Sequence, residues 1–329
     1  MEQDNRKEQS ALAALMPGDR FCGFYLLKSA QAGTTAAGKP YLNLRLADRT
    51  GELPGKHWDY AGPVDSGDAG RAVWASGRVE SYQNAPQAVL EELRLTGEDD
   101  DFDPGLLVPT APRSPGDMLA YVERTLGALE DDDYRSVCLT VLERHRAGFA
   151  ALPGAKSMHH GYLHGLLLHT ANMLLSAERL ANVYQDVIDR SLLLAGVFLH
   201  DIGKLAEFKT TELGLVGEYS REGQLLGHLF LGAEEVGEIA RAAGIPEEKR
   251  LLLQHLIASH HGIPEYGTLV EPKCAEAELL SLLDMIDSRM EMYRKAYEET
   301  PPGSFTRQKI YGLHNNAVYR PVEGAPQEE

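Results

Sequence analysis

The chain has 329 residues, 32 Lys and Arg against 49 Asp and Glu, a formal net charge of −17 and 43% hydrophobic residues. This length predicts two domains, and the hydrophobic content excludes a wholly disordered chain. The three cysteines lie far apart without a CxxC pair, and no apolar run reaches the roughly 18 to 20 residues that span a bilayer, so we expect a cytoplasmic protein without a membrane partner.

The negative charge is unevenly distributed. Residues 16–96 hold nine Lys and Arg and nine Asp and Glu, whereas residues 97–134 hold two Arg and eleven acids. Because sequence-independent affinity for nucleic acid comes from Lys and Arg, the total charge disfavours a nucleic-acid partner. Because basic and acidic residues are equal in number over residues 16–96, a nucleic-acid partner is not excluded for this segment.

Short β segments account for residues 21–96. Residues 41–46 (YLNLRL) combine a period-two alternation with an apolar bias. The turn-forming run Asp48–Gly51 follows directly. Four or five such strands in about 75 residues, without a helical period, predict a small all-β barrel resembling the oligonucleotide-binding (OB) fold. We assign it to residues 1–96.

An acid run and three prolines in residues 97–113 predict a linker. Ser114 and Pro115 then resemble a helix cap followed by proline at the first helical position, and apolar residues at helical spacing follow. We therefore predict an all-α domain over residues 114–329. Its helices are expected at 115–129, 132–149, 163–184, 188–200, 223–243, 247–260 and 274–298.

Histidines gather in this second domain. Nine of the twelve lie between His159 and His261, and several follow apolar runs, as His169 does after three leucines. Burying an unpartnered imidazole or carboxylate costs several kcal/mol, so repeated burial implies mutual pairing or a shared cation. Taken alone, each histidine is more often a hydrogen-bonded core residue than a metal ligand, and Asp284 could simply pair with a residue four positions along its helix. His255 is predicted to be structural. The ordered set together indicates a metal centre.

The predicted ligands lie on successive helices, and the carboxylate of Asp201 can bridge two ions. Nitrogen and oxygen donors without thiolate suit Mn²⁺, Fe²⁺, Co²⁺ or Zn²⁺, of which we favour Mn²⁺ and expect two ions. Asp287 is an alternative last ligand because it shares a helix face with Asp284. The ligand set is His169, His200, Asp201, His228, His260, His261 and Asp284.

Lys204, three residues after Asp201, would place an ammonium beside an anion held by the metals. Two divalent ions that clamp a phosphoryl oxygen and activate a hydroxide are a common solution for phosphoester hydrolysis near neutral pH. We therefore predict this chemistry, with Asp201 and Lys204 as catalytic residues.

These motifs resemble the HD-domain metallophosphohydrolases, which carry the pattern H…HD…D. MHHGYLHGLLLHT, LHDIGK, SHHG and LLDMIDSRM, together with GKPYLNLRLADRTGELPGKHWD and the final YGL…YRP, more narrowly resemble the YhaM-type 3′-to-5′ exoribonucleases over nearly the whole chain. The resemblance implies an OB fold followed by an HD domain, and a Mn²⁺-dependent nuclease releasing nucleoside 5′-monophosphates from single-stranded RNA and also single-stranded DNA. It implies that Lys204 faces phosphate. The chain departs from the pattern at His164 and Leu168.

An OB fold binds single strands by stacking bases on aromatic rings over a basic groove. We expect nucleic-acid contacts from Lys39, Tyr41, Arg45 and Lys56 in the barrel and from His159 and His160 near the metal centre. Trp58 and Trp74 are predicted to pack in the core. The expected partners are single-stranded RNA or DNA and further copies of the chain in a homo-oligomer.

Two other functions fit the same residues. An HD phosphohydrolase could act on a mononucleotide or a signalling nucleotide, with the barrel serving assembly. A nucleic-acid-binding accessory protein could instead carry a metal centre that is purely structural.

Overall fold

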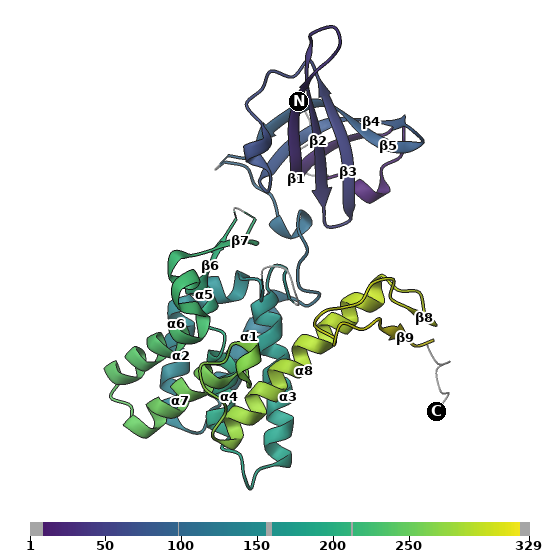
Figure 1. The fold of residues 1–329 in the computed structure, drawn as a ribbon. Helices are drawn as coiled ribbons and strands as arrows, with labels where there is room; N and C mark the ends of the chain where they lie inside the picture. Colours follow the sequence, from purple (N-terminus) through teal and green to yellow (C-terminus); the bar gives the residue numbers. More distant parts are fainter. Residues whose placement is uncertain (1–8, 98, 156–159, 212, 323–329) are drawn as a thin grey trace. The chain divides into compact units, whose positions relative to one another are not determined.

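The computed structural model describes residues 9–97, 99–155, 160–211 and 213–322. The chain divides into two compact units (Figure 1). The first comprises Met1–Thr110 with Thr210–Leu215, and the second comprises Ala111–Lys209 with Val216–Glu329. The finer division into residues 1–96, 97–113 and 114–329 remains a prediction.

Five strands of the first unit close into a barrel in the order β1-β2-β3-β5-β4. All neighbouring strands pair antiparallel except β3 and β5, which pair parallel at Gly55 and Ala88. This five-stranded closed barrel confirms the predicted OB-type fold. The strands are β1 (Arg20–Thr34), β2 (Pro40–Asp48), β3 (Gly51–Trp58), β4 (Ala72–Tyr82) and β5 (Ala85–Leu95); short 3₁₀ turns are η1 (Leu12–Ala14), η2 (Ser66–Asp68) and η3 (Pro104–Leu106).

Alternation along β2 explains how the barrel fills its interior. Leu42, Leu44 and Leu46 are at most 5% exposed and belong to the barrel core. Successive side chains of a strand point to opposite faces, so Tyr41 and Arg45 are directed outward. The barrel therefore has its own hydrophobic core and an outer face available to a ligand.

Helices account for most of the second unit, as predicted. Acidic or hydroxyl side chains cap several of them; Asp189, for example, accepts a hydrogen bond from the backbone of Leu192 at the start of α4. The helices are α1 (Pro115–Gly127), α2 (Asp132–Ala151), α3 (Gly165–Val183), α4 (Arg190–Leu199), α5 (Lys204–Glu207), α6 (Arg221–Ala242), α7 (Glu247–Ser259) and α8 (Ala275–Glu298), with the turn η4 (Pro264–Tyr266).

Helix α4 is the central element of this unit. Every residue from Ser191 to Leu199 is buried, so α4 is apolar on all sides, and α2, α3, α7 and α8 all contact it. A helix buried in this way delivers the residues at its end into the interior. His200 and Asp201 are those residues.

Two short two-stranded sheets interrupt the helical unit, so the prediction of a purely helical domain was wrong at these segments. They pair β6 (Phe208–Thr210) with β7 (Val216–Tyr219) and β8 (Ser304–Phe305) with β9 (Tyr319–Arg320). Strands of two to four residues are too short to show a period of two in the sequence. Among the described residues, no helix combines the length and apolarity needed to cross a membrane.

Candidate functional site

The seven predicted metal ligands come together inside the helical unit. His169 lies on α3, His200 and Asp201 follow α4, His228 lies on α6, and the remaining three lie at the end of α7 and on α8. His200 and His260 are at most 1% exposed, and His169 and Asp201 are both 3% exposed. Segments distant in sequence thus converge on one buried cluster of imidazoles and carboxylates.

Backbone carbonyls orient two of the imidazoles. The Nδ1 atoms of His200 and His260 each lie 2.8 Å from the carbonyl oxygen three residues earlier, of Val197 and Ile257. Because a carbonyl only accepts, each Nδ1 carries the hydrogen and each Nε2 keeps its lone pair. Both lone pairs are then available to a cation.

Two glycines fix the approach of α6 to this cluster. A Cβ on Gly203 would lie 2.1 Å from the carbonyl oxygen of His228 and 2.7 Å from the amide nitrogen of Gly232, so the HDIGK glycine permits close packing. Gly227 has φ 72° and ψ 159°, which kinks α6 just before His228. The backbone N–H of His228 then donates to Glu207 Oε1 at 3.1 Å, and the kink sets the direction of its ring.

Asp201 lies between two groups of ligands. Its Oδ2 is 3.3 Å from His200 Nε2 and 3.8 Å from His169 Nε2. Its Oδ1 is 3.6 Å from His228 Nε2 and 3.7 Å from His260 Nε2. One carboxylate therefore presents a separate oxygen to each group, as a residue bridging two ions must.

Two nitrogens in the cluster lack a hydrogen bond within the part of the chain that the structure describes. His228 Nε2 and His261 Nδ1 are buried without a hydrogen bond among the described residues. His228, His260 and His261 each offer a ligand atom within 4.8 Å of the others, and so do His169, His200 and Asp201. A buried unsatisfied nitrogen is costly, and a divalent cation would satisfy both atoms at once. The donor set therefore fits a divalent cation.

Electrostatics favours the protonation states that metal binding requires. Burial raises the pKa of Asp201, but the charges of Lys204 and His200 together lower it by more. The pKa of Asp201 therefore lies well below the usual range of an aspartate. Burial lowers the pKa of His260 and His261. Ionised carboxylates and neutral imidazoles are the forms that bind cations.

His169 differs from these imidazoles. Burial lowers its pKa, but hydrogen bonds to Asp284 and Asp287 outweigh burial and raise the pKa to about 10. Asp284 Oδ1 lies 3.4 Å from His169 Nε2, on the side of the other ligands. A cation bound there would replace the proton held between these two atoms.

Lys204 lies inside the cluster. Its Nζ donates to Asp201 Oδ2 at 2.7 Å and to the carbonyl oxygen of Gly154 at 2.8 Å. An ammonium has three N–H donors, so one remains for another acceptor. The position agrees with a lysine beside a metal-bound anion.

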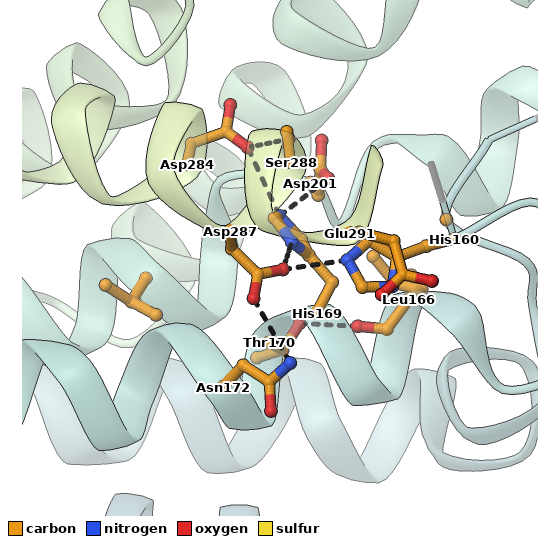
Figure 2. Close-up of polar contacts among 12 residues, drawn as sticks. His160, Leu166, His169, Thr170, Asn172, Asp201, Asp284, Asp287, Ser288 and Glu291 are labelled. Atoms are coloured by element: carbon orange, nitrogen blue, oxygen red, sulfur yellow. Dashed lines mark hydrogen bonds and ion pairs between the residues drawn. The ribbon is translucent and has the colours of Figure 1, made fainter. Parts of the chain in front are cut away.

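Asp287 bonds the outer nitrogen of His169 (Figure 2). Its Oδ2 is 2.7 Å from His169 Nδ1 and 2.8 Å from His160 Nε2, and its Oδ1 accepts a hydrogen bond from Asn172. A carboxylate that bonds the outer nitrogen of a histidine fixes its tautomer and strengthens it as a ligand. The two carboxylates of DMID thus occupy opposite sides of one imidazole.

His160, which the sequence predicts to contact nucleic acid, is 1% exposed and bonds other side chains of the protein. Its Nδ1 lies 3.0 Å from the hydroxyl of Tyr162, and that hydroxyl donates to Glu291. Sequence reasoning missed Asn172, Tyr162 and Glu291; the only signal was spacing, since Glu291 follows Asp287 by four residues on α8. His255 is structural as predicted, since its Nε2 accepts from the backbone of Lys273.

The HD domain model matches residues 166–289, which contain all seven predicted ligands. The 3′-5′ exoribonuclease YhaM of Halalkalibacterium halodurans is 34% identical over 306 residues, covering 92% of this chain and 94% of that protein. The protein of the same name from Bacillus subtilis is 33% identical, covering 93% and 96%. The chain belongs to the YhaM family of 3′-to-5′ exoribonucleases.

A solved OB-fold domain of replication protein A from Methanococcus maripaludis also matches this YhaM-family chain. It is 16% identical and covers 29% of this chain and 100% of that domain, with a TM-score of 0.22. The assignment of the barrel rests on its own strand order.

The barrel of this YhaM-family member groups aromatic rings with one cation on its outer surface. The rings of Tyr41 and Trp58 lie 5.5 Å apart, and Lys56 Nζ lies 5.3 Å from the first and 4.8 Å from the second. Tyr82 extends the group, with its ring 5.9 Å from the same Nζ. Trp58 is 45% exposed and Tyr82 52%, so the prediction that Trp58 packs in the core was wrong.

The other two cations predicted to contact nucleic acid, Lys39 and Arg45, lie near acidic side chains. Lys39 pairs with Asp59 at 3.2 Å, and Arg45 lies 3.5 Å from Glu52. These pairs are exposed, so solvent screens them and a phosphate can compete for the cations. His159 lies outside the described residues.

Proposed function

We propose that the protein is a metal-dependent 3′-to-5′ exoribonuclease that hydrolyses single-stranded RNA, and also single-stranded DNA, to nucleoside 5′-monophosphates. The single observation that carries this proposal is the buried cluster in which Asp201 presents one oxygen to each of two groups of imidazoles, within a chain of the YhaM family.

Each group supplies ligands for one divalent ion. His169, His200 and Asp284 with Asp201 Oδ2 would hold one, and His228, His260 and His261 with Asp201 Oδ1 would hold the other. Mn²⁺ is the favoured ion, with Fe²⁺, Co²⁺ and Zn²⁺ as the alternatives for such donors. Two bound ions supply a polarised phosphoryl oxygen and an activated water.

The protein's own residues position these parts. Lys204 holds Asp201 in place through Oδ2 and keeps one N–H for a phosphate oxygen. Asp287 acts through His169 as a positioning residue, because its hydrogen bond fixes the ring that faces the ion. Of Asp284 and Asp287, we therefore propose Asp284 as the metal ligand.

The barrel would select the substrate. Tyr41 and Trp58 offer rings on which bases stack, and Lys56 and the exposed Lys39 and Arg45 offer charge to the phosphates. Stacking favours single strands, because bases in a duplex present no free faces. A cytoplasmic location and a homo-oligomeric assembly complete the proposal.

The full chain with Mn²⁺ and a 5′-labelled single-stranded oligoribonucleotide tests this function. We expect products that shorten progressively from the 3′ end, with release of nucleoside 5′-monophosphates. An unshortened oligonucleotide together with turnover of free nucleotides would favour the mononucleotide phosphohydrolase. Activity that survives chelation of metal and the substitution Asp201→Ala would contradict a catalytic metal centre.

A further inference from the structure

The described chain ends in a hairpin that the metal centre does not use. Residues 303–322, which we name the C-terminal hairpin, contain Arg307, Lys309 and Arg320 and no Asp or Glu, although acids outnumber Lys and Arg 49 to 32 in the whole chain. Strands β8 and β9 pair within it, directly after α8 (Figure 1). An acidic chain thus carries a locally basic element at this point.

Aromatic rings project from the C-terminal hairpin. Tyr311 is 85% exposed, Phe305 64% and Tyr319 44%, and the rings of the last two lie 5.1 Å apart. Leu313 and Val318 are buried instead, at 4% and 6% exposed. The hairpin therefore packs Leu313 and Val318 and leaves its three aromatic rings in solvent.

Cations accompany these rings. Arg307 and Lys309 are exposed, and neither forms an ion pair within the part of the chain that the structure describes. Side chains without an acidic partner can neutralise phosphates without first breaking an ion pair. A segment that combines exposed rings with unpaired cations has the composition of sites that bind single-stranded nucleic acid.

Hydrogen bonds fix the hairpin to the helix that carries Asp284. Arg320 Nη1 donates to the carbonyl oxygens of Tyr297 at 2.5 Å and Thr300 at 3.0 Å, at the end of α8. With a rise of about 1.5 Å per residue, Asp284 and Glu298 are roughly 21 Å apart along the helix axis. At about 3.4 Å per stacked nucleotide, that separation corresponds to about six nucleotides.

We infer that the C-terminal hairpin is a second binding site for single-stranded RNA, which holds the substrate several nucleotides upstream of the 3′ end bound at the metal centre. Bases stack on Tyr311 and on the Phe305–Tyr319 pair, and Arg307 and Lys309 contact phosphates. The inference rests on the proposed function. The other candidate occupant is a second copy of the chain, and a measurement of subunit number distinguishes it from RNA.

The test compares substrates of two lengths in the full, metal-loaded chain. The first variant is Arg307→Glu with Lys309→Glu, and its control is Arg179→Glu with Arg241→Glu, two exposed arginines of the same unit whose reversal changes net charge equally. The second variant is Tyr311→Ala, and its control is Tyr184→Ala, which removes another ring that is 50% exposed.

Each hairpin variant should raise KM about tenfold for an oligoribonucleotide of about twenty nucleotides and leave kcat/KM for a dinucleotide unchanged. The charge variant should also reduce the magnitude of the slope of log affinity against log salt by about 1.4, because each phosphate contact to a single strand contributes about 0.7. Fluorescence anisotropy with a hydrolysis-resistant oligonucleotide measures this slope. The control variants should match the wild type in every assay.

Equal KM values for the variants and the wild type on the long substrate would overturn this inference while leaving the proposed function intact. A change in subunit number measured by light scattering would overturn it as well, because the hairpin would then be a subunit contact. If the wild type itself fails to shorten RNA, the proposed function fails first.

Discussion

The barrel and the helical unit place their functional residues in opposite environments. In the barrel, the leucines of β2 fill the core and Tyr41, Lys56 and Trp58 lie outside it. In the helical unit, His200, Asp201 and His260 lie at the centre of the fold, at most 3% exposed. The proposed binding residues can therefore change without cost to the barrel's core, whereas the proposed metal ligands are part of the interior they occupy.

The largest expected effect comes from Asp201→Ala. Loss of the carboxylate shared by both proposed ligand groups should lower hydrolysis well beyond the roughly 10- to 100-fold typical of an outer partner of a ligand. The variant also removes the ion-pair partner of Lys204 in the protein interior, which destabilises the unit by about 3 to 5 kcal/mol. Elemental analysis and circular dichroism should report lost metal with retained helices, and Asp201→Asn controls for folding. Full activity in either variant would contradict the shared-ligand arrangement.

Deletion of residues 1–105 tests the barrel's separate role. The helical unit has its own core, so we expect it to remain folded and to hydrolyse a small phosphodiester at the full rate. Losing several stacking sites should weaken binding of a long oligoribonucleotide by on the order of a hundredfold. The two substrates are compared by kcat/KM. Equal losses on both would refute this division of labour.

Asp287→Ala sharpens the contrast between a ligand and its partner. Removing the acceptor for His169 Nδ1 should weaken metal binding roughly 10- to 100-fold, and Asp287→Asn should restore part of it because its amide oxygen still accepts. Asp284→Ala, which removes a proposed ligand, should weaken binding further. Titration calorimetry with Mn²⁺ measures all three. A larger loss for Asp287→Ala than for Asp284→Ala would reverse their assigned roles.

The smallest effect is expected on the barrel surface. Trp58→Ala removes a ring that is 45% exposed, so the free energy of unfolding should change by less than about 1 kcal/mol while RNA affinity falls roughly tenfold. Leu44→Ala, a core substitution on the neighbouring strand, should instead cost about 2 to 5 kcal/mol. Urea unfolding and fluorescence anisotropy separate the two. Strong destabilisation by Trp58→Ala would place that ring in the core after all.

Much of the fold was predictable because its elements are long and strongly patterned. The alternation of YLNLRL marked β2, and the apolar run before His200 marked the buried helix α4. Strands β6 to β9 escaped prediction because two to four residues show no period. The role of Gly203, which permits close packing against α6, was visible only in the structure.

The sequence by itself determined that imidazoles and carboxylates would be buried on successive helices, because several of them follow apolar runs whose burial is favourable. Only the tertiary structure decided which atoms meet. Asp284 and Asp287 are three residues apart on α8, yet they bond opposite nitrogens of His169. Periodicity reports which face of a helix is buried, whereas the packing of α3 against α8 sets the position of each atom, and a shift of one side chain exchanges a metal ligand for its supporting partner.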